Sequence, residues 1–462
     1  MCDLSDNIKS KKVLVIGMGK SGLESAKFLK NKGAELYIQD NKTMEEFDED
    51  TQKTIEDLNG ELYLNEMPDN LTEMDMIVVS PGVPADIPLI KEAKEANVKV
   101  IGELELAYLF SKGSFVAITG TNGKTTTTTL VWEIFKAAGI DARLVGNIGS
   151  PVIASLKGEN EKTWYITEVS SFQLETIKEF SPRISAILNI TPDHLDRHKT
   201  IEAYGKVKGR IKENQGPEDF TIVNFDDKST LAVASGTKAT LASFSKFYDI
   251  KFGGLIIDDY IAVLDSDGNR HLVCKVDDLN IPGNHNLENV LAATTIAYFA
   301  GIDTKIIGKV LSEFKGVEHR LEDCGTVKGV QYVNDSKGTN TDAAIKAIEA
   351  MKKPIILIAG GYDKKANFTS FVKAFGTRVK HLVLIGATAV KIKNAAENQG
   401  FKNTVILPNM QEAVKEAARR AEEGDVVLLS PACASWDQYE NFEERGKDFK
   451  SAVEVLKTVK VR

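Results

Sequence analysis

The sequence predicts an α/β protein built from doubly wound units, and three stretches carry that prediction. Near the N-terminus, VLVIGMGKSGLESAKFLKNKGAELYIQD has the pattern of a strand, a glycine turn, a helix and a second strand. VAITGTNGKTTTTT, at residues 116–129, repeats the order of strand, glycine turn and helix. After residue 317, apolar strands such as PIILIAGG and HLVLIG again end in glycine or polar turns. Strands and helices that alternate in this way form parallel sheets covered by helices.

Length and composition predict a soluble globular protein of two to four domains. The chain has 462 residues, of which 42% are hydrophobic and 27% are charged, and one core rarely serves more than about 300 residues. The longest apolar runs are strand-sized, and MCDLSDNIKSKK lacks the apolar stretch of a signal peptide. We therefore expect no membrane partner. The net charge of −8 argues against a nucleic-acid partner.

The four cysteines indicate a reducing compartment. Cys2, Cys274, Cys324 and Cys433 are scattered along the chain without C-x-x-C spacing. This pattern predicts reduced thiols and no zinc site, so we expect a cytoplasmic protein.

The N-terminal stretch carries a dinucleotide-type glycine motif. Gly17, Gly19 and Gly22 fit G-x-G-x-x-G, and Asp40 ends the next strand. The glycines let a diphosphate approach the backbone and the helix start, while the acid can hold a ribose or a base. NAD and a UDP-linked substrate both suit this geometry. We favour the nucleotide sugar, because no domain for a hydride acceptor follows; a purely structural turn is the third alternative.

Residues 116–129 predict a phosphate-binding loop. Gly120 and Gly123 allow a tight turn, Lys124 adds positive charge, and the hydroxyl of Thr125 can reach Mg²⁺. The strict G-x-x-x-x-G-K-[ST] pattern is not met, since Ile118 stands at the first glycine position. A strand before the loop and a helix after it favour nucleotide binding over a chance Gly/Thr-rich turn.

Polar residues follow the next predicted strands. Asn147 lies in the turn GNIGSP, and Glu168 ends an apolar strand, where a carboxylate suits Mg²⁺. His194 belongs to the polar cluster of ITPDHLDRH, where it could bind a metal or only cap a helix. Lys208 lies on the basic helix TIEAYGKVKGRIKEN, whose lysines by default form a solvated face. For Glu168, the alternative to a metal ligand is a glutamate that caps a helix or forms a salt bridge.

Two further patterns lie near the end of the middle stretch and in the last stretch of the chain. Residues 237–280 predict β-hairpins, and an amphipathic helix should follow the turn Gly-Asn-His-Asn. In the last stretch, polar side chains at strand ends suit a small dicarboxylate or amino-acid ligand. They are Asp335, Ser336, Lys337, Thr339, Lys364 and Ser435.

Eleven short motifs, in order along the chain, resemble those of the Mur ligase family. They are GMGKSG, SPGVP, GTNGKTT, GNIG, EVSSFQLE, NITPDHLDRH, PGNHNLEN, HR at 319–320, NDSKGTN, GGYDK and SPACASWDQYENF. The resemblance covers essentially the whole chain. The chain departs from it in two places: Asn41-Lys42 replaces a common Thr-Arg, and Trp436 replaces a smaller apolar residue.

The resemblance implies three domains. Residues 1–104 would form a Rossmann-like domain that binds the UDP substrate. Residues 105–316 would form a central P-loop-type ATPase domain, with a mainly parallel sheet and a small β-sheet. Residues 317–462 would form a Rossmann-like domain that binds the amino acid.

The resemblance also implies the residues of each site. Those that bind the UDP substrate would be Ser21, Asp40, Asn41, Lys42, Gly82 and Asn147. Those that bind ATP would be Gly120, Thr121, Asn122, Gly123, Lys124, Thr125, Thr126, Asn286, Asn289, Arg320 and Asp335. Those that bind the amino acid would be Lys337, Thr339, Lys364, Ser435 and Phe442. The magnesium ligands would be Thr125, Glu168, His194 and a carbamylated Lys208, and the catalytic residues would be Lys124, His194 and Lys208.

The implied activity is ATP-dependent amide ligation in peptidoglycan precursor synthesis. SPACASWDQ and the short N-terminal domain favour the branch that adds D-glutamate to UDP-N-acetylmuramoyl-L-alanine through an acyl phosphate. ATP and two Mg²⁺ ions would be the cofactors, and a monomer is expected. The alternatives are a ligase that adds L-lysine or diaminopimelate, a folylpolyglutamate synthase-like enzyme, an NAD-dependent enzyme and a non-catalytic nucleotide-binding regulator.

Overall fold

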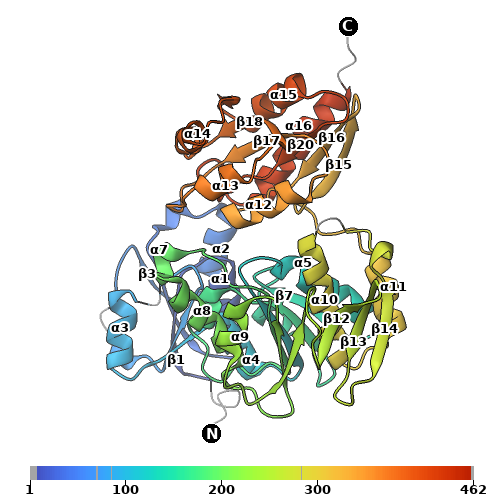
Figure 1. The fold of residues 1–462 in the computed structure, drawn as a ribbon. Coiled ribbons are helices and arrows are strands. Elements are labelled where there is room, and N and C mark those ends of the chain that lie inside the picture. The colour runs from blue at the N-terminus through green and yellow to red at the C-terminus, as the bar shows by residue number, and fades with distance from the viewer. Residues whose placement is uncertain (1–7, 69–70, 85, 282–283, 459–462) are drawn as a thin grey trace. The chain divides into compact units, whose positions relative to one another are not determined.

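A computed structural model describes residues 8–68, 71–84, 86–281 and 284–458. It divides into two compact units. The first contains Met1–Ile190, Arg197–Val276 and Val290–Val310; the second contains Thr191–Asp196, Asp277–Asn289 and Leu311–Arg462. Three sheets run through these units, as the sequence predicts for an α/β protein (Figure 1).

The N-terminal sheet has five parallel strands in the order β3-β2-β1-β4-β5. The strands are β1 (Lys12–Ile16), β2 (Glu35–Asp40), β3 (Glu61–Leu64), β4 (Met76–Val79) and β5 (Lys99–Gly102). One core cluster packs α1 (Lys20–Asn31), α2 (Glu49–Leu58) and α4 (Glu103–Phe110) on one face. A second cluster packs α3 (Pro88–Glu95) on the other. The strand order changes direction between β1 and β4, which is where open parallel sheets bind ligands.

The central sheet has nine strands in the order β14-β13-β12-β11-β10-β9-β6-β8-β7. The parallel strands are β6 (Ser114–Thr119), β7 (Ala142–Gly146), β8 (Trp164–Glu168), β9 (Ile184–Ile187), β10 (Phe220–Asn224), β11 (Thr240–Phe244) and β12 (Gly253–Ile257). The antiparallel hairpins expected within 237–280 are present. They consist of β12, β13 (Tyr260–Leu264) and β14 (Arg270–Lys275), and they extend the edge of the same sheet.

The helices of the middle stretch are α5 (Lys124–Ala137), α6 (Ser171–Leu174), α7 (Leu195–His198), α8 (Ile201–Gly209), α9 (Lys228–Ala234), α10 (Asn284–Phe299) and α11 (Thr304–Glu313). Two expectations for α10 are wrong. The helix already begins at Asn284, inside the predicted Gly-Asn-His-Asn turn. Residues 290–297 are all buried, so it is not amphipathic there. Burial of residues 290–297 explains the second difference, because a helix that is buried on all sides shows no amphipathic pattern.

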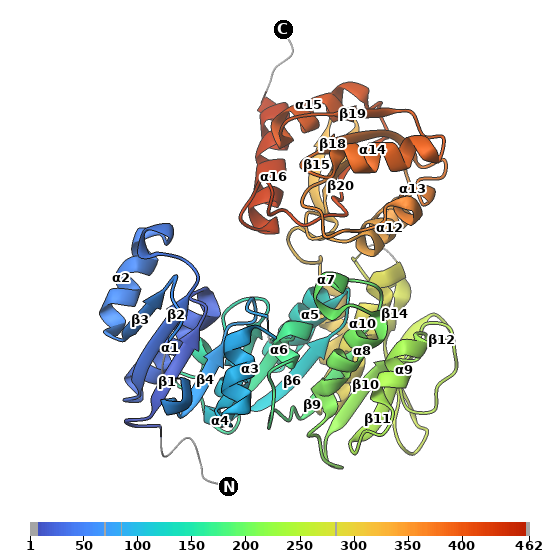
Figure 2. The ribbon, with the colours of Figure 1, turned by 90° about the vertical axis from the view of Figure 1, so that its left-hand side faces the viewer.

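The C-terminal sheet has six strands in the order β15-β16-β20-β17-β18-β19. The strands are β15 (Glu322–Val327), β16 (Val330–Asn334), β17 (Ile355–Gly360), β18 (Val379–Ile385), β19 (Thr404–Ile406) and β20 (Val426–Leu429). Only β15 is antiparallel. One face packs against α12 (Thr341–Ala350), α13 (Thr369–Lys373) and α14 (Ala389–Asn398). The other packs against α15 (Met410–Arg420) and α16 (Phe442–Thr458), as Figure 2 shows. This is the second doubly wound unit that the sequence predicts.

Three cysteines fall within the described residues. Cys274, Cys324 and Cys433 are free thiols, as the scattered spacing predicts. Burial raises the pKa of the Cys433 thiol to about 11. Cys2 lies outside the described residues. In the part of the chain that the structure covers, no helix combines the length and apolar character needed to span a bilayer.

Candidate active site

The glycine motif after β1 forms a tightly packed turn in the first unit. Gly17 has φ +86°, and its carbonyl accepts a hydrogen bond from the Ser80 hydroxyl at 2.7 Å. A Cβ on Gly22 would lie 1.8 Å from the Gly17 carbonyl oxygen, so the helix can approach this closely only without a side chain. Beyond the turn, no atom of the other described residues lies within 4 Å of the Cβ position of Gly82, apart from its chain neighbours. The glycine turn is therefore held by contacts within the protein, and the space next to Gly82 is large enough for a ligand group to approach its backbone.

Asp40 stabilises this turn from the end of β2. One of its carboxylate oxygens accepts the Met18 N–H at 2.6 Å, and the other accepts the Lys42 N–H at 3.0 Å. The Asn41 side chain accepts from Gln39 Nε2 at 3.2 Å, and the Lys42 ammonium lies 5.3 Å from the centroid of the Phe47 ring. Asp40 thus has a structural role in addition to any contact with a ligand. Ser21 lies in the first turn of α1, and its carbonyl accepts from the Ser25 hydroxyl at 2.8 Å.

The predicted phosphate-binding loop joins β6 to α5. Gly120 and Gly123 have φ +156° and +84°, and α5 begins at Lys124 as predicted. The Lys124 ammonium donates to the carbonyls of Gly120 and Thr121, both at 2.8 Å. Thr125 and Thr126 are buried in the first turn of the helix. Within the described residues, the Thr126 hydroxyl makes no hydrogen bond.

Asn189, which sequence reasoning does not include among the site residues, fixes this loop. Its side chain accepts the Asn122 N–H at 2.8 Å and donates to the Asn122 carbonyl at 3.0 Å. Its own carbonyl accepts the Thr121 N–H at 3.0 Å. Its place just after β9 could have indicated this role, because β9 pairs directly with β6, the strand that leads into the loop.

Glu168 and Lys208 approach the same loop from two sides. Glu168 ends β8 opposite Ile118, is 1% exposed, and accepts from Asn147 Nδ2 at 2.8 Å. Lys208, on α8, is also 1% exposed, and its ammonium donates to the Gly120 carbonyl at 2.9 Å. The Lys208 ammonium lies 4.5 Å from the centroid of the Tyr204 ring. The solvated face expected from the basic sequence of this helix is therefore wrong for Lys208.

The oxygen donors beside this loop suit a hard cation. Thr125 supplies a hydroxyl and Glu168 supplies a buried carboxylate, which are ligands that Mg²⁺ accepts together with phosphate oxygens. Both residues belong to the first unit. His194 belongs to the second unit, where its N–H donates to Asp193 at 3.0 Å.

The second unit contains a cavity of about 320 Å³. Thr339 and Lys364, two predicted amino-acid ligands, line it together with His194 and Asp193. The Lys364 ammonium lies 3.7 Å from a carboxylate oxygen of Asp193. These residues give the cavity both charge signs, as a zwitterionic ligand requires.

Trp436 lies beside this cavity. It is 60% exposed, and its ring centroid is 5.5 Å from that of Tyr362, which lines the cavity. The Lys364 ammonium lies 5.7 Å from the Trp436 ring centroid. The unusual tryptophan therefore forms an aromatic surface next to Lys364 and does not fill the core.

Arg445 of α16 connects the loops that precede two other predicted amino-acid ligands, Lys337 and Ser435. Arg445 is 1% exposed and donates to the Ser336 carbonyl at 2.8 Å and the Ser336 hydroxyl at 3.0 Å. It also donates to the carbonyls of Cys433 and Ala434, both at 3.1 Å. Burial lowers the pKa of Arg445 to about 10. One guanidinium thus joins the loop before Lys337 to the loop before Ser435.

Lys337 and Phe442 lie side by side in this region. The Lys337 ammonium is 4.7 Å from the centroid of the Phe442 ring, and the Phe442 carbonyl accepts from the Ser336 hydroxyl at 2.8 Å. The contact orients Lys337 from α16, which lies more than a hundred residues further along the chain.

Three predicted nucleotide ligands of the second unit, Asn286, Asn289 and Asp335, are buried, whereas Arg320 is half-buried. Asn286 and Asn289 are hydrogen-bonded to each other at 3.0 Å on α10. Burial raises the pKa of Asp335 to about 6, although nearby Arg320 opposes the shift. The Asp335 carboxylate accepts from the Ser430 hydroxyl at 2.7 Å. Among the described residues, Arg320 Nε makes no hydrogen bond.

One further cluster resembles a metal site but is already neutralised. Glu318, His319 and Glu322 present ligand atoms within 4.8 Å of one another. The Lys450 ammonium bonds to both glutamates, at 2.6 Å and 2.8 Å. A lysine therefore occupies the position where a cation would be needed.

Comparison with known proteins covers nearly the whole chain. Residues 11–102 match the Mur ligase MurD-like N-terminal domain, residues 118–297 the Mur ligase middle domain, and residues 319–433 the Mur ligase glutamate ligase domain. UDP-N-acetylmuramoylalanine--D-glutamate ligase of Thermoanaerobacter sp. (strain X514) is 48% identical over 97% of this chain and 99% of its own. The enzyme of that name from Clostridioides difficile (strain 630) is 47% identical over 98% of this chain and 100% of its own.

Solved structures show the same fold at low sequence identity. UDP-N-acetylmuramate-alanine ligase MurC from Thermotoga maritima aligns with a TM-score of 0.61 at 19% identity, over 96% of this chain and 99% of that one. MurF ligase from Thermotoga maritima, in complex with ADP, aligns with a TM-score of 0.59 at 17% identity, over 98% and 97%. Together with the three matching domains and the full-length relatives, these likenesses show that the chain belongs to the Mur ligase family.

Proposed function

We propose that this chain joins D-glutamate to UDP-N-acetylmuramoyl-L-alanine with ATP, in the synthesis of peptidoglycan precursors. The observation that carries the proposal is near-full-length identity of 47–48% to relatives named for that ligation. The separate phosphate loop and charged cavity support it, because ligation requires an activating nucleotide and an amino-acid site.

The reaction needs activation because a carboxylate does not condense with an amine unaided. The alanyl carboxylate attacks the γ-phosphate of ATP, which forms an acyl phosphate and releases ADP. The D-glutamate amine then attacks the acyl carbon, and phosphate leaves as the amide forms. Lys124, at the start of α5, would bind the transferred phosphoryl group and offset its charge.

Each group of ligands has a proposed place. Ser21, Asp40, Asn41, Lys42, Gly82 and Asn147 would bind the UDP substrate; Gly120–Thr126, Asn286, Asn289, Arg320 and Asp335 would bind ATP; Lys337, Thr339, Lys364, Ser435 and Phe442 would bind D-glutamate. The attacking amine must first lose a proton, and His194 and Asp193 are the candidate acceptors beside the cavity. The proposed domain ranges remain 1–104, 105–316 and 317–462.

Thr125, Glu168, His194 and a carbamylated Lys208 would hold the magnesium ions. When bound, Mg²⁺ would offset phosphate charge and orient the phosphate oxygens. Carbamylation adds CO₂ to the neutral Lys208 amine with loss of a proton, and so replaces a buried ammonium with a carboxylate. The proposed localisation is cytoplasmic, and the proposed functional form is a monomer.

Phosphate release tests the proposed ligation. The enzyme should release phosphate from ATP only when UDP-N-acetylmuramoyl-L-alanine and D-glutamate are both present. L-lysine, diaminopimelate and L-glutamate serve as alternative acceptors. Lys124→Ala should abolish release, whereas Lys136→Ala, in the last turn of the same helix, should not. Turnover with L-lysine and none with D-glutamate would refute the proposed acceptor.

The carbamate on Lys208 has a separate test. Lys208→Ala should lose activity, and formate or acetate should restore part of it by supplying the missing carboxylate in the cavity left by the side chain. Lys206→Ala on the same helix is the matched control. A fully active Lys208→Ala enzyme would exclude a role for the carbamate.

A further inference from the structure

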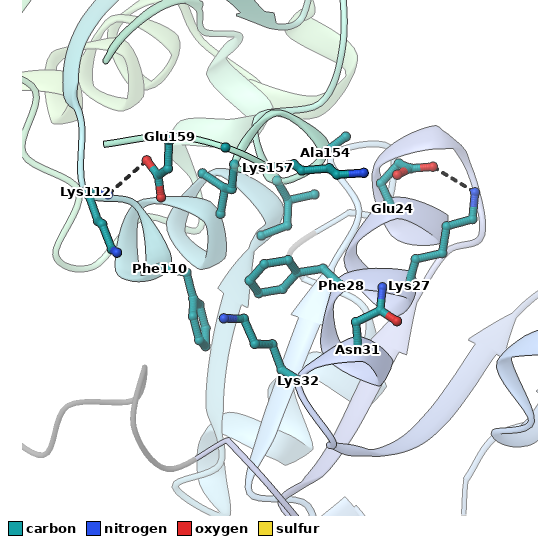
Figure 3. A pocket seen from close by; sticks show the side chains of 13 residues that line it. Glu24, Lys27, Phe28, Asn31, Lys32, Phe110, Lys112, Ala154, Lys157 and Glu159 are labelled. Carbon is teal, nitrogen blue, oxygen red and sulfur yellow. Dashed lines mark hydrogen bonds and ion pairs between the residues drawn. The ribbon is translucent and has the colours of Figure 1, made fainter. Parts of the chain in front are cut away.

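A cavity of about 580 Å³ lies in the first unit beside the C-terminal half of α1. Its other walls are the end of α4 and residues 153–159, which include η3 (Ile153–Ser155) (Figure 3). The volume falls within the range of small-molecule sites. Among the described residues that line it, none belongs to the UDP, ATP, metal or amino-acid ligands proposed above. The cavity is therefore separate from the ligation site.

The floor of the cavity is aromatic and aliphatic. Phe28 and Phe110 are half-buried, and their ring centroids lie 5.0 Å apart at an interplanar angle of 74°. Ile153 and Leu156 are buried beside them. An edge-to-face pair of this kind offers an open ring surface on which a third flat group can pack.

Lys32 links this floor to the charged rim. Its ammonium lies 5.4 Å from the Phe28 ring centroid and 5.6 Å from that of Phe110, as Figure 3 shows. A cation within about 6 Å of an aromatic face is held by the ring quadrupole. The ammonium is thus fixed at the edge of the apolar floor, where it can meet an anionic substituent of a ligand bound there.

The rim carries an excess of positive charge. Four lysines and two glutamates line the cavity, in a protein whose net charge is −8. Glu24 is bonded to Lys27 at 2.9 Å. Glu159 accepts the Lys112 N–H at 3.0 Å and the Tyr165 hydroxyl at 2.7 Å. Both carboxylates are therefore already engaged by protein donors.

Three ammonium groups remain for a ligand. Lys32, Lys112 and Lys157 are exposed, and within the described chain none of their ammoniums forms an ion pair. Lys32 follows the last residue of α1, Lys112 follows α4, and Lys157 follows η3. Figure 3 shows the Lys32 and Lys112 ammoniums on the side of Phe110, whereas the Lys157 ammonium is directed toward Glu24. An anion bound by Lys32 and Lys112 would connect segments far apart in the sequence.

We propose that this cavity binds a small aromatic phosphate. The ring packs against the aromatic floor of Phe28 and Phe110, and the phosphate lies between Lys32 and Lys112. A neutral aromatic compound would leave the ammoniums unused, and inorganic phosphate would leave the apolar floor exposed to water. The combination of both groups is what the lining selects.

Calorimetric titration with 2-naphthyl phosphate tests the site. The full chain is first saturated with UDP and ADP, so that the two nucleotide sites are filled. Binding at one site is expected, weaker at high salt because the contacts are ionic. The double variant Lys32→Gln/Lys112→Gln should bind about tenfold more weakly, since two charge contacts of somewhat under 1 kcal/mol each are lost. Both side chains are exposed, so the substitutions leave the core intact.

Lys30→Gln is the matched control, because Lys30 is exposed on the same helix but does not line the cavity. It should bind 2-naphthyl phosphate as the parent chain does. 2-Naphthol and inorganic phosphate should each bind more weakly than the combined probe. The proposal is overturned if the parent chain shows no saturable binding, or if the double variant keeps the parent affinity.

Discussion

Asn189 shows how one side chain can set the shape of the proposed nucleotide-binding loop. Its amide makes two hydrogen bonds to the backbone of Asn122, and its carbonyl accepts from Thr121. A buried backbone group that loses its partner costs about 1–3 kcal/mol. The loop before Lys124 therefore depends on a residue that lies more than sixty positions away in the sequence.

Asn189→Ala should weaken ATP binding more than it weakens the fold. We expect the KM for ATP to rise roughly tenfold, which corresponds to about 1.4 kcal/mol. Asn189→Asp keeps an acceptor for the Asn122 N–H and should have a smaller effect. Steady-state kinetics measure both changes, and thermal denaturation shows whether the variants remain folded. An unchanged KM for ATP in folded Asn189→Ala would contradict this role.

For Arg445, we predict a corresponding effect on the binding of the amino acid. A lysine at this position has no planar fork, so it cannot bond to Ser336, Cys433 and Ala434 together. Arg445→Lys should raise the KM for D-glutamate at least roughly tenfold, equivalent to about 1.4 kcal/mol, while the KM for ATP stays the same. Arg419→Lys, on the exposed side of α15, is the control. Equal increases in both KM values would contradict a role of Arg445 that is specific to the amino acid.

At the scale of elements, α4 carries a buried carboxylate. Glu103 is 1% exposed, and its Oε1 accepts the Ile153 N–H at 2.7 Å. Burial raises the pKa of Glu103 to about 7, above the 4.5 of the unfolded chain. The folded state therefore holds a proton more tightly, and this contribution to stability is lost as pH rises from 4.5 to 7.

Glu103→Gln should remove that pH dependence. A glutamine accepts the Ile153 N–H but does not ionise. As pH rises from 5 to 8, the parent chain should lose up to about 3 kcal/mol of its free energy of unfolding through Glu103, and the variant should not lose it. Denaturant unfolding at each pH measures the difference. Glu92→Gln, an exposed change on α3, should show no such trend, and parallel curves for Glu103→Gln and the parent would contradict the prediction.

The elements that the sequence predicted are those with local signals. The strand, turn and helix around Lys124 are encoded within fourteen consecutive residues, and the structure has them at the expected positions. The start of α10 was missed because Gly-Asn-His-Asn favours a turn when read alone. Asn189 was missed because its partner Asn122 lies 67 residues away in the sequence. Arg445 was missed because its partner Ser336 lies 109 residues away. Contacts of that span leave no pattern in a single sequence.

At the scale of the whole molecule, the proposed ligands are divided between the two units. Lys124 and Lys208 belong to the first, whereas Lys337 and Lys364 belong to the second. The acyl phosphate would form on the first unit, and the amine that attacks it would be bound by the second. Reacting atoms must come within about 3–3.5 Å of each other. Ligation therefore requires the two units to bring their ligands together during each turnover.

Ligand binding should accordingly compact the chain in solution. A non-hydrolysable ATP analogue, UDP-N-acetylmuramoyl-L-alanine and D-glutamate together should lower the radius of gyration, because binding energy from both units favours the closed arrangement. Small-angle X-ray scattering measures this change, and D-glutamate alone should produce a smaller one. Lys124→Ala with the same ligands is the control for the contribution of the phosphate loop. Scattering that is identical with and without saturating ligands would mean that the units already hold their ligands together, and closure would then not be part of the reaction.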